Sequence, residues 1–220
     1  MGKPVLTSAA EDFLRAVLDL ERERGKATTN ELAAKLGITA PSATAMAKKL
    51  DAQGLVERAP YRGVTLTERG RLVALEVLRH HRLLELYLAD TLGMSIADVH
   101  AEADLLEHVL SERLEQRIDE ALGFPTRDPH GDPIPDGNLR LAEPADTSLA
   151  VLEIGAAATV VRVPDGDGDV LRYLAELAIA PGVEIEVLRR APFEGPVTVK
   201  VADAEHAIAS DLAGRIGVAL

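Results

Sequence analysis

The sequence changes from helical to strand periodicity across a proline-rich segment. Before residue 124, apolar residues recur at the three- and four-residue spacing of amphipathic helices. After Ser148, short stretches alternate apolar and polar residues, as half-buried strands do. Residues 124–146 between them hold five prolines and two glycines in a polar context, which predicts a linker. We therefore expect a mainly α chain with a C-terminal all-β domain.

The first 72 residues show the helix, short helix, helix and hairpin order of a winged helix-turn-helix. Glycine ends each of the three helices, as is common at helix C-termini. The predicted helices are Ala9–Arg24 with Ser8 as its cap, Thr29–Leu36 and Thr39–Gln53, and the predicted strands are Leu55–Arg58 and Gly63–Leu66.

The third of these helices is the expected recognition helix, and the hairpin is the expected wing. The same packing occurs in small helical domains that touch no DNA, but the basic residues on this helix and wing favour DNA. The candidate DNA-binding residues are Thr39, Ser42, Thr44, Lys48 and Lys49 on the helix, with Tyr61 and Arg62 on the wing.

Charge is distributed unevenly along the chain. The whole chain carries −12, whereas residues 1–72 have twelve basic and nine acidic residues, a net +3, which leaves −15 for the rest. A mildly basic head on an acidic body suggests that only the head meets a polyanion.

The composition narrows the cellular setting and the type of metal site. No apolar run reaches the ~18 residues of a membrane span, and the N-terminus lacks a signal-peptide core, so we expect a cytoplasmic protein. The chain has no cysteine, so nitrogen and oxygen donors would have to hold any metal.

Metal-capable side chains gather at helical spacing between residues 100 and 108. On one continuous helix, His100, Asp104 and His108 would form a row with Glu107 beside it. His81 and Glu85 have the same four-residue spacing on the preceding helix. A solvated charged face is the common alternative, but three of only six histidines stand next to carboxylates here, which favours a divalent cation.

The middle of the chain is predicted to be helical and to form a dimer. A long helix runs from Thr67 to about Leu92, Ser95 caps the helix bearing His100–His108, and another covers Ser111–Gly123. Their apolar residues exceed the needs of one core, and a symmetric homodimer would match a palindromic operator. The C-terminal part is predicted as a small β-barrel with a helix at Val170–Leu177 and strands at Ala158–Val163, Val183–Leu188, Val197–Val201 and Ala207–Ala209.

Several segments in the same order resemble the diphtheria toxin repressor family of iron- and manganese-dependent regulators. The resemblance spans nearly the whole chain, and the terminal β segment is similar to that family's SH3-like (FeoA-like) domain. The matching segments are Glu11–Arg15, Tyr61–Thr67, His81–Glu85, Val99–Ala103, Glu107–Glu112 and Asp128–Pro135.

The resemblance implies three domains: a DNA-binding domain over 1–72, a metal-binding and dimerisation domain over 73–143, and the SH3-like domain over 144–220. It also implies a primary and an ancillary metal site. The loop with Asp165, Asp167 and Asp169 could supply a further metal donor, and the alternative is that it is an ordinary acidic turn. The implied primary ligands are Asp12, Asp104, Glu107 and His108, and the implied ancillary ligands are His81, Glu85 and His100.

The resemblance also bears on the choice of metal. Iron-dependent members place sulfur donors where Asp12 and Asp104 stand, whereas manganese-dependent members place carboxylates, so Mn²⁺ is expected first and Fe²⁺ second. Arg15 stands where one manganese subgroup has an acid and a closely spaced metal pair, which favours two separated sites.

These features predict a metal-gated repressor. The ion would neutralise repelling carboxylates and tie the first helix to the dimer body, so that metal and DNA binding become linked. A metal-dependent hydrolase and a metal buffer are the rival classes, but the sequence has no nucleophile elbow, phosphate-binding glycine loop or His-Glu-x-x-His pair, so we expect no enzyme.

Overall fold

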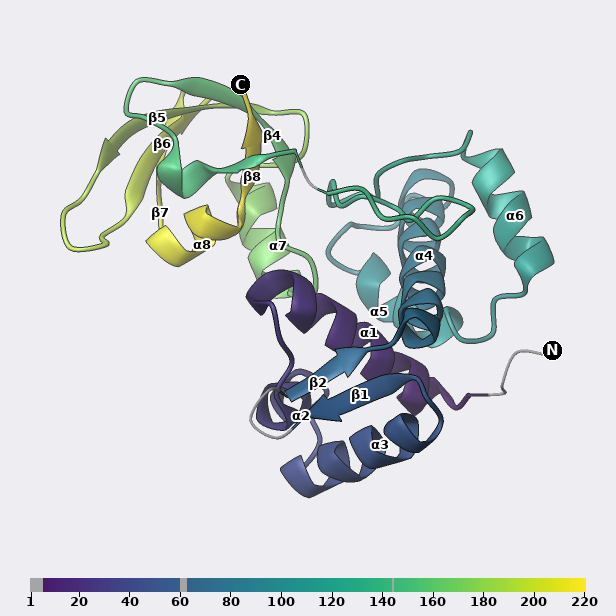
Figure 1. The fold of residues 1–220 in the computed structure, drawn as a ribbon. Helices are drawn as coiled ribbons and strands as arrows, with labels where there is room; N and C mark the ends of the chain where they lie inside the picture. Colours follow the sequence, from purple (N-terminus) through teal and green to yellow (C-terminus); the bar gives the residue numbers. More distant parts are fainter. Residues whose placement is uncertain (1–5, 60–62, 144) are drawn as a thin grey trace. The chain divides into compact units, whose positions relative to one another are not determined.

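The computed structural model describes residues 6–59, 63–143 and 145–220 (Figure 1). The chain forms two compact units. The first contains the chain up to His81 together with Leu106–Glu112 and Pro135–Leu141, and the second contains Arg82–Leu105, Arg113–Ile134 and Ala142–Leu220. Among the described residues, none of the helices combines the length and apolar character that a membrane crossing requires.

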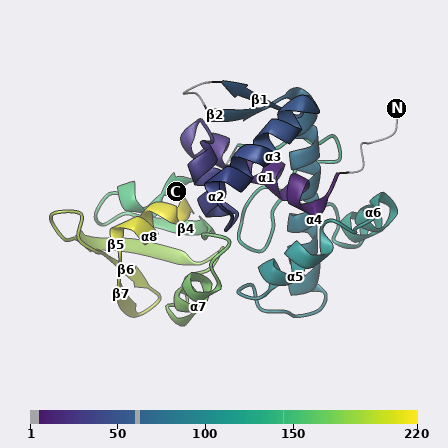
Figure 2. The ribbon, with the colours of Figure 1, turned by 90° about the horizontal axis from the view of Figure 1, so that it is seen from below.

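The first unit contains the predicted winged helix-turn-helix. Phe13, Leu14, Leu32 and Leu50 are fully buried in one core that also takes residues from the hairpin. Helix α3 contacts strand β1, and Figure 2 shows the hairpin next to the helices. The elements are α1 (Ser8–Arg24), α2 (Thr29–Lys35), α3 (Ala40–Ala52), β1 (Val56–Ala59) and β2 (Gly63–Leu66).

The helix ends follow local chemistry, with one correction. Thr28 forms a capping box with Glu31, and the Thr39 hydroxyl accepts the Ser42 N–H at 3.3 Å. The predicted cap Ser8 is wrong, because Thr7 is the N-cap of α1 and Ser8 is already helical. Gly25 ends α1 with a φ of 73°, a left-handed conformation that glycine adopts without strain.

The central helices are α4 (Glu68–Asp90), α5 (Val99–Leu106) and α6 (Glu112–Ala121). The predicted helix through His108 is wrong, because α5 ends at Leu106 and the chain turns there. The ring of His80 contacts the Glu107 carbonyl oxygen through Nδ1 at 3.0 Å. That oxygen is thus bonded to a side chain of α4 rather than to the next turn of a helix.

The second unit contains a six-stranded antiparallel sheet in the order β3-β8-β4-β5-β6-β7. The SH3-like class is confirmed, although among the described residues the edge strands β3 and β7 do not pair with each other and the sheet is open. The first and last strands and helix α8, which Figure 2 shows alongside the sheet, were not predicted. The elements are β3 (Thr147–Ser148), η1 (Leu149–Val151), β4 (Ala157–Arg162), α7 (Gly168–Glu176), β5 (Glu184–Arg190), β6 (Val197–Val201), β7 (Ala204–Ile208), α8 (Ser210–Arg215) and β8 (Gly217–Ala219).

The proline-rich segment is more ordered than a linker. Its residues Asp128 and His130 are buried, and the His130 carbonyl accepts the Val163 N–H at 2.9 Å. Gly131 has a φ of 91°, and an added Cβ would collide with the Val161 carbonyl oxygen. The segment is therefore packed tightly against β4 and the residues that follow it.

Candidate metal centres

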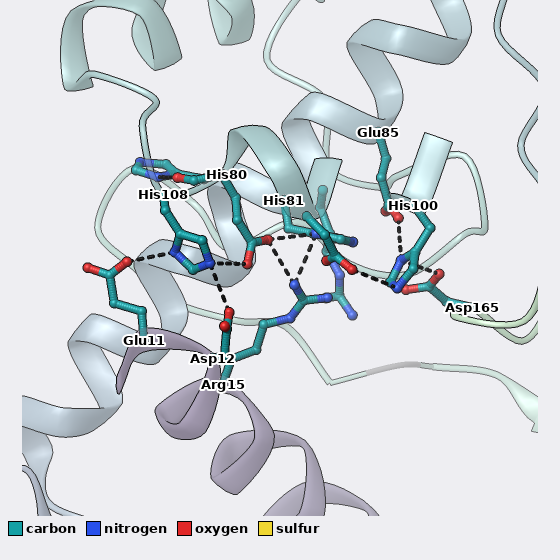
Figure 3. Close-up of polar contacts among 12 residues, drawn as sticks. Glu11, Asp12, Arg15, His80, His81, Glu85, His100, His108 and Asp165 are labelled. Atoms are coloured by element: carbon teal, nitrogen blue, oxygen red, sulfur yellow. Dashed lines mark hydrogen bonds and ion pairs between the residues drawn. The ribbon is translucent and has the colours of Figure 1, made fainter. Parts of the chain in front are cut away.

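Three of the predicted ligands meet in the first unit (Figure 3). Asp12 lies on α1, whereas Glu107 and His108 lie in the turn after α5. The Nε2 atom of His108 is 2.8 Å from Asp12 Oδ1 and 3.4 Å from Glu107 Oε1. One donor atom from each residue lies within 4.8 Å of the other two. We call Asp12, Glu107 and His108 the first cluster.

The buried carboxylate of Glu107 contacts side chains other than those of the first cluster. Its Oε2 atom accepts a hydrogen bond from Arg15 Nη1 at 2.8 Å and lies 2.7 Å from His81 Nδ1. The guanidinium therefore sits beside the cluster and offsets part of its negative charge. Burial raises the pKa of Asp12, and the nearby charge of His108 opposes that shift.

A second group of donors meets in the second unit. His100 Nδ1 lies 3.1 Å from Glu85 Oε1 and 3.2 Å from Asp165 Oδ1. His130 Nε2 lies 3.7 Å from the same Glu85 oxygen and 3.6 Å from the same Asp165 oxygen. We call Glu85, His100, His130 and Asp165 the second cluster. The acidic-loop residue Asp165 is thus part of a cluster rather than of an isolated turn.

The histidines of the second cluster favour the ionised form of Asp165. Burial raises the pKa of Asp165, but the hydrogen bond with His100 and the charge of His130 outweigh it and hold that pKa below its usual value. Burial lowers the pKa of His130, but the carboxylates of Glu85 and Asp165 attract its proton and raise that pKa overall. At 3.6 and 3.7 Å the attraction is electrostatic and not a hydrogen bond.

His130 was not among the predicted ligands. It is fully buried, and neither of its ring nitrogens has a hydrogen-bond partner among the residues that the structure describes, which is costly for a polar ring unless a ligand satisfies it. Asp128 supports this loop by accepting the N–H groups of His130 and Asp132 at 2.9 Å each. Burial raises the pKa of Asp128 to about 7, although the charge of Arg82 opposes the shift. The sequence signal was a histidine two residues after an aspartate in a proline-rich segment.

The two remaining predicted ligands, Asp104 and His81, also lie beside metal-capable side chains. Asp104 belongs to the second unit, where its Oδ2 lies 3.6 Å from His100 Nε2. His81 belongs to the first unit, beside Glu107. The predicted row of His100, Asp104 and His108 on one helix is wrong, because α5 ends before His108.

The predicted DNA-binding residues on α3 lie at its surface. Thr39, Ser42, Lys48 and Lys49 are exposed, and Thr44 is half-buried with its hydroxyl donating to the Ala40 carbonyl at 2.9 Å. Ala43, Ala47 and Leu50 form the buried face of the same helix. The predicted wing residues Tyr61 and Arg62 lie outside the described residues.

Comparison with known families assigns most of the chain. The model for the iron dependent repressor N-terminal DNA-binding domain matches residues 5–64, and the model for the iron dependent repressor metal-binding and dimerisation domain matches residues 67–136. The FeoA domain model matches residues 147–220.

Whole-chain relatives and solved structures agree with these matches. The iron-dependent repressor IdeR of Mycobacterium tuberculosis is 33% identical over 198 residues, covering 83% of this chain and 84% of that protein. The diphtheria toxin repressor of Corynebacterium diphtheriae is 29% identical, with 97% of each chain covered. A manganese-dependent transcriptional repressor in complex with manganese has a TM-score of 0.88 at 39% identity, covering 96% of this chain and 99% of that one.

The winged helix-turn-helix and the matches to both repressor family models identify the chain as a metal-dependent transcriptional repressor. The chain belongs to the diphtheria toxin repressor family, because relatives above 30% identity and the repressor family models both cover most of its length.

Proposed function

We propose that this protein represses transcription in response to Mn²⁺. It binds palindromic operator DNA as a homodimer when an ion at the first cluster ties α1 to the turn after α5, and so controls metal-homeostasis genes. One observation carries the proposal. Asp12 comes from α1 and Glu107 and His108 come from the turn, yet their donor atoms lie within 4.8 Å of one another.

The core of the DNA-binding domain explains how an ion bound to α1 would affect DNA binding. Phe13 and Leu14, which follow Asp12, are fully buried in the core that also holds Leu50 of α3. An ion that fixes α1 therefore restricts the recognition helix as well. Coupling of roughly 1–3 kcal/mol is typical of such linked equilibria, and it is reciprocal. We include Asp104 among the proposed ligands of this site.

The second cluster is proposed as an ancillary site. Glu85, His100, His130 and Asp165 supply two imidazoles and two carboxylates, and three of these four side chains come from α4, α5 and the loop before α7. His81, one turn before Glu85 on α4, is included as a further proposed ligand. The ring nitrogens of buried His130, which have no hydrogen-bond partner within the described part of the chain, fit a site that binds a cation.

The donor chemistry supports Mn²⁺. Both clusters offer carboxylate oxygens, which suit hard ions such as Mn²⁺, and imidazole nitrogens, which also bind Fe²⁺ and Zn²⁺, and the chain has no cysteine to favour softer ions. A separated pair of sites is supported by Arg15, whose guanidinium already holds one oxygen of Glu107. The alternative is an Fe²⁺-dependent regulator of iron uptake, which the iron-dependent relatives favour.

The proposed DNA contacts come from α3. Its exposed residues carry two ammonium groups and hydroxyls that suit phosphate and base contacts, while the small Ala45 leaves room for readout of DNA shape. The proposed contact residues are Thr39, Ser42, Thr44, Lys48, Lys49, Tyr61 and Arg62.

A metal series tests the proposal. The probe is a fluorescent duplex selected from random sequence by the Mn²⁺-loaded protein, and its anisotropy is titrated with Mn²⁺, Fe²⁺, Co²⁺ and Zn²⁺ at one salt concentration. Mn²⁺ should activate DNA binding at a free concentration that is reached in cells, and a much lower half-point for Fe²⁺ would favour the iron alternative. Binding that needs no metal would overturn both.

A further inference from the structure

Both ring nitrogens of His108 contact carboxylates of neighbouring residues on α1 (Figure 3). Glu11 Oε2 lies 2.7 Å from Nδ1, and Asp12 Oδ1 lies 2.8 Å from Nε2. The ring is mostly buried, with 12% of the side chain exposed. Two consecutive acidic residues therefore hold opposite edges of one imidazole.

Because of these two contacts, the position of the ring proton decides which nitrogen of His108 can bind a metal ion. A neutral imidazole carries one N–H, and only the bare nitrogen can bind a metal ion. If the proton stood on Nε2, it would be donated to Asp12, and two donor atoms of the first cluster would be bonded to each other. If it stands on Nδ1, Nε2 and the Asp12 oxygen both remain available to a cation.

We infer that Glu11 is a positioning residue that accepts the Nδ1–H of His108 and so presents Nε2 as the metal-binding atom. The inference rests on the proposed function of the first cluster and adds a residue that touches no ion. Carboxylates that orient a metal-binding histidine in this way typically contribute roughly 10–100-fold to metal affinity.

Glu11 acts from a useful place in the fold. It lies on α1 next to Asp12, whereas His108 lies in the turn after α5. The other charged groups at the cluster are engaged on the far edge, since Glu107 Oε1 is 3.4 Å from Nε2 and Glu107 Oε2 binds Arg15. The same contact therefore selects the tautomer and aligns α1 with the turn.

Calorimetric titration of the full-length protein with Mn²⁺ tests the inference. Glu11→Ala should weaken binding at the first cluster by roughly 10–100-fold and leave the second cluster unchanged. Glu11→Gln keeps an amide oxygen that can accept the same N–H, so it should restore most of the affinity. Glu23→Ala is the matched control, because Glu23 is an exposed residue of the same helix, 3.7 Å from Lys35.

The histidine tautomer gives a second readout that a merely structural role would not move. In ¹⁵N-histidine NMR of chelator-treated protein, at a pH where His108 is neutral, the wild type should carry the proton on Nδ1. Glu11→Ala should shift it toward Nε2. A wild-type proton on Nε2 overturns the inference even if Glu11→Ala does not fold, and so does unchanged affinity in Glu11→Ala.

Asp12→Ala separates this inference from the proposed function. If Asp12→Ala loses Mn²⁺ at the first cluster and Glu11→Ala does not, only the role of Glu11 fails. If Asp12→Ala also keeps full affinity, the first cluster is not the metal site and both fail.

Discussion

Replacing Asp12 by alanine should uncouple DNA binding from metal binding. Asp12 is the donor that α1 contributes to the first cluster, while Glu107 and His108 are adjacent in the turn after α5. Without Asp12, an ion held by the turn alone would make no bond to α1. The variant should therefore still fold and still bind operator weakly, but added Mn²⁺ should no longer strengthen that binding.

The magnitude follows from the coupling that the cluster supplies. A coupling of 1–3 kcal/mol corresponds to a gain in DNA affinity of roughly 5–150-fold on adding metal, and this ratio should fall to about one in Asp12→Ala. The fold should tolerate the change, because the Asp12 side chain is 42% exposed and Glu11 and Arg15 keep their contacts with His108 and Glu107.

The assay is anisotropy of the selected duplex with and without saturating Mn²⁺ at fixed salt. Asp19→Ala is the control on the same helix, because it removes an ion pair with Lys35 at 3.1 Å but no proposed ligand. Exposed pairs of this kind contribute up to ~1 kcal/mol to folding, so Asp19→Ala should keep full metal dependence. If Asp12→Ala also keeps it, the proposed tie between α1 and the turn is refuted.

Three further changes test other parts of the structure. His130→Phe keeps a buried ring but removes both nitrogens, so the Mn²⁺ affinity of the second cluster should fall by tenfold or more, which corresponds to roughly 1.4 kcal/mol for each factor of ten. An unchanged affinity in calorimetric titration would exclude His130 as a ligand. Arg15→Glu replaces the guanidinium that binds Glu107 by a carboxylate, so the number of Mn²⁺ ions bound per chain in equilibrium dialysis should rise. An unchanged number would mean that Arg15 does not limit how many ions bind. Leu50→Ala in the winged-helix core should lower the free energy of unfolding by about 2–5 kcal/mol in denaturant titrations. Leu72→Ala, at a position that is 46% exposed, should lower it far less, and equal losses in the two variants would contradict the assigned core.

The limits of sequence reasoning show most clearly at the end of α5. Apolar periodicity continues through His108, so a helical row of ligands was the natural prediction. The helix ends at Leu106. The next residue, Glu107, contacts the ring of His80 through its carbonyl oxygen and accepts a hydrogen bond from Arg15 through its carboxylate. These partners are distant in sequence, and local periodicity carries no information about them.

His130 shows the same limit from the other side. Proline and glycine around it predict a linker, and that local signal is correct about the absence of regular structure between α6 and β3 among the described residues. Its burial depends on a close approach of Gly131 to the carbonyl oxygen of Val161 in β4. A ligand of this kind is visible only when both segments are in place.

Local sequence patterns were enough to predict the helices and hairpin of the DNA-binding domain, the later change to strands, and the nitrogen and oxygen chemistry of the donors. Periodicity, capping residues and glycine are local properties, so they can be read in order along the chain. Which donors lie together depends on the folded chain, since Asp12 contacts His108 across 96 positions of sequence. Packing of buried apolar faces brings such residues together, and the polar side chains are carried to the cluster by the helices and turns that hold them.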